Sequence, residues 1–460
     1  MTVKQGGAYM SDKYDLIVIG GGPGGLAAAE LAAAKKKRVL IIEKDGWGGT
    51  CTHRGCIPTK ALLTCSKFYS DLKKLKRVGV NIGNAAVDFP AMKKHQQQIV
   101  KIAALGAQKS LTDAGVEFRQ GMGEIVSPHE VRFTDSSAQS RILMTDHILI
   151  AWGSQPQILA GLQTSERILT SDDILGMATL PSAMIIVGGS FIGVEYATVF
   201  AELGVKVILV ELLDHILPLE DEEAADFLNQ ELARQGIAVH TSTKLVSLKE
   251  SAGGVVMQVE KNGEATEMRA ACALLCTGRK PLLHVEQLDK LGMDYTKAGI
   301  KVDENMMTTV RGIYAAGDVT GGMMLAHRAA RQAKVAVERM FGDGDYAYQE
   351  NFIPSVVYSH PQIARVGYTP RRAREEGLNI EIVKSNYSAN IIARAELMGQ
   401  GFVKVVFHQD KIIGAVIVGD HAADLLSPLA LAVSNELTRK QLACWVIPHP
   451  TLSEIMNFPD

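Results

Sequence analysis

The feature that most constrains the fold of this chain is an internal repeat of an apolar strand, a glycine turn, an Ala-rich helix and a second apolar strand. The first copy reads "DLIVIGGGPGGLAAAELAAAKKKRVLIIEKD" and the second reads "AMIIVGGSFIGVEYATVFAELGVKVILVELLD". In both, the same number of residues separates the first glycine from the closing acid, Gly20 from Glu43 and Gly188 from Glu211. Short, continuously apolar strands are typical of parallel sheets that are covered on both faces. The repeat therefore predicts two separate βαβ units within an α/β fold.

Length and composition limit what surrounds these units. A chain of 460 residues is too long for one ordinary core and predicts several domains. The formal charge of -2 provides no broad attraction to nucleic acid or to anionic membranes, and no apolar run is long enough to span a bilayer. The start lacks the pattern of a signal or transit peptide, and Met10 is a candidate natural start. Six cysteines are too few for a disulfide scaffold, so we expect a reducing cytoplasm and four buried thiols outside the Cys51–Cys56 pair.

The remainder of the chain shows further strand and helix patterns. Apolar strands that end in glycine turns are expected at His147–Pro156, Ala273–Pro281 and Gly312–Gly322. An Ala-rich helix follows at Leu325–Gly342. From about Asn351 the pattern changes to a hairpin at Gly401–Gly419 and an apolar helix near Leu425–Glu436. This last part predicts an α+β domain with its own layer.

Gly20, Gly22 and Gly25 have the spacing of a dinucleotide-binding turn between a strand and a helix. Gly20 permits the tight turn, Gly22 allows a pyrophosphate to approach the backbone, and Gly25 allows close packing of helix on strand. The helix N-terminus offers N–H groups to the phosphates. Glu43 would accept a hydrogen bond from a ribose. The alternative is a tight turn without a ligand.

The second turn carries Ser190 between Gly188 and Gly193, where the first has a glycine. Serine is small, and its hydroxyl can donate to a phosphate, so we expect this site to be altered but retained. Glu211 closes the unit, and no Arg follows it in "ELLDHIL" to bind a 2′-phosphate. The second unit therefore favours NAD over NADP.

Cys51 and Cys56 lie in the stretch "GGTCTHRGCIPTK" and are a metal site, a structural disulfide or a redox pair. On a regular α-helix, Cα atoms five residues apart are separated by about 8.6 Å, whereas a disulfide needs less than about 7 Å. Gly55 and Pro58 indicate an irregular helix start at the pair. A pair held in this way suits a redox role, and the helix N-terminus favours a thiolate at Cys56.

Two neighbours of the pair have competing interpretations. Lys60 lies four residues after Cys56 on the same helical face, where its charge would stabilise a thiolate or a reduced flavin; otherwise it is a solvated surface lysine. His53 is available as a metal ligand, but no second CxxC or His pair accompanies it. We therefore expect no metal site.

Taken together, these motifs resemble those of the pyridine nucleotide–disulfide oxidoreductases, from about Tyr14 to the C-terminus. "GGTCTHRGCIPTK" is similar to the family's redox-disulfide motif, "IYAAGDV" to its second flavin-contact motif, and "HPTLSE" to its C-terminal acid–base motif. The nearest resemblance is to the branch that oxidises dihydrolipoamide in 2-oxoacid dehydrogenase and glycine cleavage complexes. It implies two Rossmann-like dinucleotide-binding domains with a C-terminal α+β dimerisation domain.

The resemblance implies a role for each catalytic candidate. Cys51 would exchange with the dithiol substrate, and Cys56 would lie next to the flavin. Lys60 would pair with Glu195 near flavin N5. His449, oriented by Glu454 and supplied by the partner subunit, would be the acid–base. Two simpler interpretations stay open, because "TLSE" is also a capping box and a residue before proline is a common extended lead-in to a helix.

The resemblance also implies cofactor contacts and partners. The residues expected to contact FAD are Gly20, Gly22, Gly25, Glu43, Thr50, Lys60, Gly123, Gly153, Ser154, Asp318 and the run Met324, Leu325, Ala326 and His327. Those expected to line the NAD site are Gly188, Ser190, Gly193, Glu195, Glu211, Leu245 and Gly278. The expected partners are a second copy of the chain and a lipoyl-bearing protein, with no nucleic acid and no membrane. The implied segments are FAD-binding residues 1–153, NAD-binding residues 154–274, a central part at 275–349 and a dimerisation domain at 350–460.

Several departures from the family pattern leave other functions open. Trp152 replaces a common Thr, Ser190 a glycine, and Ile447–Pro448 a frequent His-Ala. The alternatives are a related NAD(P)H-dependent reductase of glutathione, mercuric ion or another thiol substrate, or a soluble transhydrogenase-like flavoprotein. A protein of another class would retain the fold only for binding.

Overall fold

The computed structural model describes residues 13–342, 348–398 and 400–458, so the candidate start at Met10 lies outside the described residues. They form two compact units. The first is made from the described parts of Met1–Pro58, Gln97–Gln155 and Arg279–Tyr348, and the second from those of Thr59–Gln96, Pro156–Gly278 and Gln349–Asp460. The boundaries of the four segments expected from the sequence remain a prediction.

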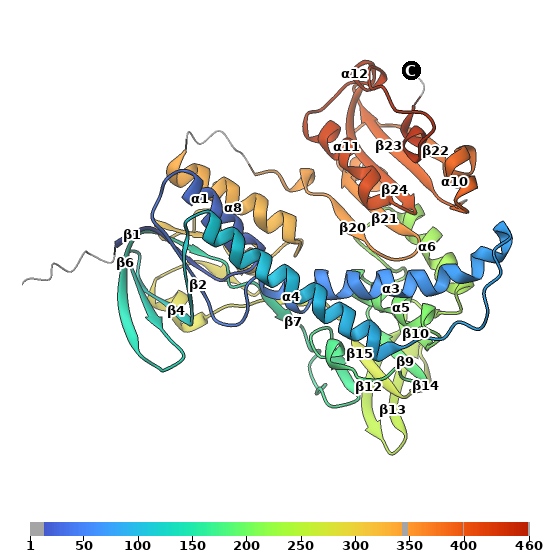
Figure 1. Ribbon diagram of the computed structural model, residues 1–460, viewed down its shortest axis with the longest axis horizontal. Helices are drawn as coiled ribbons and strands as arrows, with labels where there is room; N and C mark the ends of the chain where they lie inside the picture. The colour runs from blue at the N-terminus through green and yellow to red at the C-terminus, as the bar shows by residue number, and fades with distance from the viewer. Residues whose placement is uncertain (1–12, 343–347, 399, 459–460) are drawn as a thin grey trace, which may run out of the picture. The chain divides into compact units, whose positions relative to one another are not determined.

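The first unit is built on a seven-stranded sheet with the order β3-β2-β1-β6-β5-β4, to which β19 adds beside β6. Its strands are β1 (Lys13–Ile19), β2 (Val39–Glu43), β3 (Glu117–Gln120), β4 (Met122–Ser127), β5 (Glu130–Thr134), β6 (Ser140–Ile150) and β19 (Ile313–Ala315). Pairing from β3 to β19 is parallel, whereas β4, β5 and β6 form an antiparallel extension. Helices α1 (Pro23–Ala34) and α8 (Ala326–Phe341) pack side by side (Figure 1).

The apolar strands of this sheet are buried on both faces. Leu16 and Val18 of β1 pack into one hydrophobic cluster, which also contains Ala28 from α1. Ile17 and Ile19, which point to the opposite face, belong to a second cluster. Alternate residues thus enter different cores, which explains why the strand reads as continuously apolar rather than alternating.

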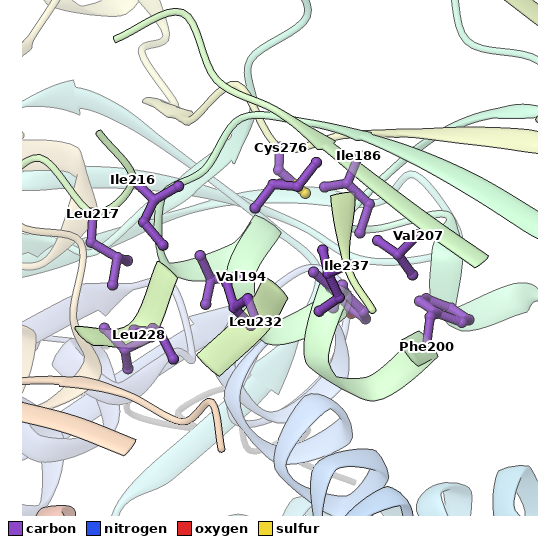
Figure 2. Packing of buried hydrophobic residues seen from close by; sticks show 14 of the residues in the cluster. Ile186, Val194, Phe200, Val207, Ile216, Leu217, Leu228, Leu232, Ile237 and Cys276 are labelled. Atoms are coloured by element: carbon purple, nitrogen blue, oxygen red, sulfur yellow. The ribbon is translucent and has the colours of Figure 1, made fainter. Parts of the chain in front are cut away.

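The second unit contains the second repeat as a parallel sheet with the order β11-β10-β9-β15-β8. Its elements are β8 (Ile168–Thr170), β9 (Ala183–Val187), α5 (Phe191–Glu202), β10 (Lys206–Val210), α6 (Glu222–Arg234), β11 (Ala238–His240) and β15 (Cys272–Leu275). Figure 2 shows how the sheet and its helices share one core, in which Ile186 and Val207 pack with Val194 of α5 and Leu228 of α6. The predicted α/β architecture is confirmed.

Two antiparallel sheets complete the second unit. A meander consists of β12 (Lys244–Ser251), β13 (Gly254–Lys261) and β14 (Glu264–Ala270). The C-terminal sheet has the order β20-β21-β24-β23-β22 and is packed by α11 (Ala422–Ser434). Its strands are β20 (Ser355–Val357), β21 (Gln362–Gly367), β22 (Glu381–Asn386), β23 (Phe402–His408) and β24 (Lys411–Gly419). The hairpin predicted at Gly401–Gly419 is confirmed, and the apolar helix begins slightly earlier than expected.

Further elements lie between these strands and helices in the sequence. Among them are the short elements α2 (Gly49–His53), β7 (Ser154–Pro156), α7 (Val285–Lys290), β16 (Arg279–Pro281), α9 (Pro370–Glu375), α10 (Ile391–Ala395), α12 (Arg439–Ala443) and the 3-10 turns η3 (Asp318–Thr320) and η6 (Leu452–Met456). The longest helices of the described residues are α3 (Cys56–Leu75) and α4 (Phe89–Asp113). The turn expected at the end of His147–Pro156 contains β7, which pairs with β16. None of the helices within the described ranges has the length and apolar character needed to cross a membrane.

Candidate active site

The first glycine turn joins β1 to α1 and is closed by the carboxylate of Glu43. Gly20 has φ +116°, and a Cβ there would lie 2.1 Å from the carbonyl oxygen of Ala151. A Cβ at Gly25 would lie 1.8 Å from the carbonyl oxygen of Gly20, so helix and strand approach too closely for a side chain. Glu43 Oε2 accepts the N–H of Gly21 at 2.5 Å, and Oε1 accepts that of Asp45 at 2.6 Å. Two of the three predicted glycines are thus required by the turn itself.

Gly22 is different, because the described chain does not require a glycine there. It is the N-cap of α1 with φ -77°, a conformation open to any residue. A Cβ at this position would have no atom of the described residues within 4 Å. The space beside the helix N-terminus is therefore left open by the chain, as a pyrophosphate would need. The turn fits a dinucleotide.

The second glycine turn reproduces this geometry between β9 and α5. Gly188 has φ +108°, and a Cβ on Gly193 would lie 1.9 Å from the carbonyl oxygen of Gly188. Glu211 Oε2 accepts the N–H of Gly189 at 2.6 Å, and its Oε1 accepts that of Leu213 at 2.8 Å. Ser190, with φ -85° and ψ -172°, has nearly the backbone conformation of Gly22. The serine therefore causes no distortion of the turn.

The cysteine pair lies at a break between two helices. Cys51 is in the short α2, Arg54 leaves helical geometry with φ -136°, and Cys56 is the first residue of α3. This is the irregular helix start that Gly55 and Pro58 predict. Both cysteines are partly buried. The remaining four thiols were expected to be buried, which holds for Cys272 and Cys276. Cys65 is only partly buried, and Cys444 is exposed because it ends the short surface helix α12.

The cysteine loop is bonded directly to the first glycine turn. The N–H of Gly48 donates to the carbonyl oxygen of Gly21 at 2.8 Å. A Cβ on Gly49, which has φ +57°, would lie 2.8 Å from the Cα of Gly22. The chain therefore packs the start of α2 against the backbone of Gly22.

His53 has a structural contact within this loop. Its Nε2 lies 3.0 Å from the carbonyl oxygen of Trp47, and a Cβ on Gly46 would lie 2.6 Å from the same nitrogen. Within residues 13–342, 348–398 and 400–458, no three His, Cys, Asp or Glu side chains are grouped so as to hold a metal ion. His53 thus packs the turn that precedes the pair.

Lys60 and Glu195 are brought together in the second unit. Lys60 Nζ donates to both carboxylate oxygens of Glu195, at 3.0 and 2.9 Å. Glu195 is only 5% exposed, so its charge is compensated mainly by this cation. Beside the pair, the hydroxyls of Thr59 and Tyr196 lie 3.3 Å apart. Lys60 is therefore not an ordinary solvated lysine.

His449 and Glu454 form a second pair near the C-terminus. His449 Nδ1 lies 2.8 Å from Glu454 Oε1, while Glu454 Oε2 accepts the N–H of Thr451 at 3.0 Å. The hydrogen bond with His449 lowers the pKa of Glu454. One carboxylate thus has two roles, since it closes the turn of η6 and orients the imidazole. The His449 side chain is 75% exposed, so its ring is open to a group outside this chain.

Asp318 belongs to a polar network that the sequence did not predict in full. Its Oδ2 accepts the hydroxyl of Ser154 at 2.6 Å. Arg279 in turn donates from Nε to that hydroxyl at 2.8 Å and from a terminal nitrogen to the Ser154 carbonyl at 3.0 Å. The only sequence signal for the contact of Arg279 with Ser154 is that Arg279 directly follows Gly278, a residue of the predicted site. Within the same unit, Trp152 packs edge-on against His284, with ring centroids 4.5 Å apart.

The remaining predicted residues occupy turns and element ends. Thr50 is in α2, Gly123 in β4, Gly153 before β7, Leu245 in β12, Gly278 before β16, and Met324, Leu325, Ala326 and His327 at or just before the start of α8. Apart from Lys60, the residues expected to contact FAD fall in the first unit. The residues expected to line the NAD site fall in the second unit, as does the acid–base pair. Their roles remain predictions.

Comparison with known proteins agrees with this geometry. The chain matches the pyridine nucleotide-disulphide oxidoreductase family over residues 14–333 and that family's dimerisation domain over residues 353–458. It is 35% identical to a dihydrolipoyl dehydrogenase of Chlamydia pneumoniae (97% of this chain, 96% of the relative) and 33% identical to one of Bacillus subtilis (97% of both). Its fold is similar to the crystal structure of LpdA from Mycobacterium tuberculosis, with a TM-score of 0.90, 29% identity and coverage of 96% and 98%. The chain therefore belongs to the pyridine nucleotide-disulphide oxidoreductase family.

Proposed function

We propose that this protein is an FAD-dependent dihydrolipoamide dehydrogenase that reduces NAD+. The observation that carries the proposal is the bond between the cysteine loop and the first glycine turn, Gly48 N–H to Gly21 O at 2.8 Å. Through this bond the loop that contains the thiol pair lies beside the glycine turn proposed for FAD. The second glycine turn of the chain is then available for NAD. The full-length similarity to dihydrolipoyl dehydrogenases supports this choice of substrate.

The two turns would hold the two cofactors. Gly22 and the N-terminus of α1 would receive the FAD pyrophosphate, with Glu43 at the ribose and Asp318 farther along the molecule. Ser190 and the N-terminus of α5 would receive the pyrophosphate of NAD, with Glu211 at its ribose. When bound, FAD supplies the two-electron chemistry that links the thiol pair to NAD+.

The protein residues perform the thiol chemistry. A substrate thiolate attacks Sγ of Cys51 in the oxidised pair, so that a mixed disulfide forms and Cys56 leaves as a thiolate. His449, held by Glu454, takes the proton of the second substrate thiol, which attacks the substrate sulfur of the mixed disulfide. This attack breaks the bond between the substrate sulfur and Sγ of Cys51, which leaves as a thiolate, so that cyclic lipoamide and the reduced pair result. Lys60 and the N-terminus of α3 stabilise the Cys56 thiolate.

The acid–base group requires a second copy of the chain. The chain contains the family's dimerisation domain, and His449 lies in it with its side chain exposed. We therefore propose a homodimer in which each subunit supplies His449 to the other. The substrate would be a lipoyl group on a separate protein of a 2-oxoacid dehydrogenase or glycine cleavage complex, in a reducing cytoplasm.

Lipoamide-dependent reduction of NAD+ by the purified protein tests the function. Cys51→Ser and Cys56→Ser should each abolish turnover and keep FAD bound, because the thiols do not form the glycine turn. Cys444→Ser is the matched control, since this thiol is exposed in a different part of the chain. Full activity in either variant of the pair would contradict the proposal.

A related disulfide reductase is the second candidate. The chain is 25% identical to the flavoprotein disulfide reductase RclA of Escherichia coli, with a TM-score of 0.85 and coverage of 97% and 98%. Turnover of glutathione disulfide with NADPH, faster than that of lipoamide with NADH, would favour this candidate. Glu211, with no following Arg to bind a 2′-phosphate, favours the NAD-linked reaction.

A further inference from the structure

The contacts of Lys60 include a residue that belongs to neither glycine turn nor the thiol pair. Tyr358 directly follows β20 in the C-terminal part of the chain. Its backbone N–H donates to Glu195 Oε1 at 3.1 Å, the same oxygen that Lys60 contacts at 3.0 Å. The ammonium of Lys60 lies over the Tyr358 ring, 4.4 Å from its centroid. Tyr358 therefore touches both members of the ion pair.

The ring of Tyr358 is held in place by its surroundings. It packs against an apolar cluster that includes Leu62 and Leu63 of α3 and Val199 of α5. Two residues later, His360 Nδ1 lies 2.8 Å from Glu202 Oε1. The segment after β20 is thus bonded to α5 at two carboxylates that are seven residues apart.

The second of these carboxylates also secures α3. Ser66 donates from its hydroxyl to Glu202 Oε2 at 2.5 Å. Gln235 Nε2 donates to the carbonyl oxygen of His360 at 2.6 Å. The segment that contains Tyr358 therefore cannot shift without breaking contacts to α3, to α5 and to the residue that follows α6.

A lysine ammonium is attached to a flexible four-carbon stem, so each additional partner reduces the range of positions that it samples. Glu195 attracts Lys60 from one side, and the negative face of the Tyr358 ring attracts it from another. We infer that Tyr358 is a positioning residue, which holds the Lys60 ammonium at the position where it stabilises the Cys56 thiolate one turn earlier on α3. The inference rests on the proposed function, since that function gives Lys60 its task.

Tyr358→Leu tests the inference against Tyr358→Phe, which keeps the ring and the backbone N–H. In the Leu variant, kcat for lipoamide oxidation should fall roughly three- to tenfold, in line with the loss of a cation–π contact. The KM for NAD should change by less than about twofold, because the glycine turn is untouched. The Phe variant should keep the activity of the unmodified protein.

A second readout follows the thiol itself. In a Cys51→Ser background, the rate at which iodoacetamide alkylates Cys56 at pH 7 reports its thiolate fraction. Tyr358→Leu should lower this rate about threefold, and should have no effect when Lys60→Met is also present. Tyr69→Leu is the control, because Tyr69 packs against the same cluster but lies nine residues, or about 13 Å, along α3 from Lys60.

The outcomes separate the positioning role from the proposed function. If Tyr358→Leu leaves both kcat and alkylation unchanged, or if the Phe variant loses as much as the Leu variant, Tyr358 does not position Lys60. The same holds if the Leu effect persists in the Lys60→Met background. If the unmodified protein fails to oxidise lipoamide while the alkylation differences appear as expected, the proposed function fails and the positioning role stands.

Discussion

The two glycine turns have the same backbone and different continuations. In both, the carbonyl oxygen of the second glycine accepts an N–H from the loop after the second strand: Gly48 donates to Gly21 at 2.8 Å, and Leu217 donates to Gly189 at 2.9 Å. In the first unit this loop continues into the cysteine pair. In the second it continues to Asp221, which caps α6 by accepting the N–H of Ala224. The strand, turn and helix are therefore shared, and the loop that follows them decides the chemistry.

The largest difference between the two units should appear when the close approach of helix and strand is blocked by a side chain. Gly25→Ala places a Cβ 1.8 Å from the carbonyl oxygen of Gly20, and Gly193→Ala places one 1.9 Å from that of Gly188. Both displace the backbone of the turn. We expect Gly25→Ala to be purified without FAD, whereas Gly193→Ala should keep its flavin absorbance and raise the KM for NAD by more than about tenfold. Loss of FAD from the Gly193 variant would show that the turns are not independent.

Substitution of the closing acids, Glu43 and Glu211, should have effects of intermediate size. Each carboxylate accepts two backbone N–H groups, and a glutamine can accept only with one of its two terminal atoms. Loss of a charge-assisted hydrogen bond costs about 1.5–3 kcal/mol. Glu211→Gln should therefore raise the KM for NAD roughly ten- to hundredfold, and Glu43→Gln should weaken FAD binding by a similar factor. Fluorescence titration of apoprotein with FAD measures the second effect. Equal NAD affinity in Glu211→Gln would contradict the role proposed for this acid in the NAD site.

Exchanging the middle residues tests whether the open space at the first turn serves a ligand. Gly22→Ser should leave the Tm of the apoprotein unchanged, because a Cβ there meets no atom of the described residues within 4 Å. FAD affinity should fall about tenfold, since the side chain enters the space of the pyrophosphate. Ser190→Gly, the reverse exchange, should change the KM for NAD by less than about threefold. A fall in the apoprotein Tm of Gly22→Ser would mean that the chain itself needs the glycine.

The smallest expected effect is a pH dependence that arises from His147 of the first unit. His147 pairs with Leu16 in the sheet, and Cys272 pairs with Met184 at the corresponding place in the second. Burial lowers the pKa of His147 below its ordinary 6.5, despite the opposing influence of Asp146. The unfolded chain therefore takes up the proton more readily than the folded chain. The contribution of neutral His147 to the free energy of unfolding is thus complete at neutral pH and is lost as the pH falls below 6.5.

His147→Cys introduces the residue of the second unit, where burial keeps the thiol neutral by raising the pKa of Cys272 to about 11. Between pH 7.5 and 5.5 the unmodified protein should lose about 0.5 kcal/mol of unfolding free energy more than this variant, a value reduced by partial exposure of the ring. Denaturant unfolding at the two pH values measures the difference. An identical loss in both proteins would assign the acid sensitivity to other groups.

The sequence predicted those parts of the site that depend on local geometry. The glycine turns, the closing acids and the break between Cys51 and Cys56 follow from backbone requirements within a few residues. Gly22 shows the limit of this reasoning, because only the structure reveals that the described chain has room for a side chain at this position.

Contacts over long separations could not be predicted in this way. The pairing of Lys60 with Glu195 came from resemblance to a family, and Arg279 and Tyr358 were missed. Their side chains reach the site through folding, and neither is part of a local pattern. The Arg279–Ser154–Asp318 network, for example, joins two of the three segments of the first unit.

The bond between Gly48 and Gly21 also bears on the order in which the protein acquires its parts. The first glycine turn and both thiols come from one continuous stretch, residues 20–56, so their mutual contacts are local and close quickly during synthesis. His449 lies far later in the sequence, beyond the last helix of the C-terminal sheet domain, and emerges from the ribosome long after this stretch. A nascent chain can thus assemble its thiol loop well before it has the proposed acid–base group, and under the proposed function proton-assisted exchange with substrate has to wait until His449 has been synthesised.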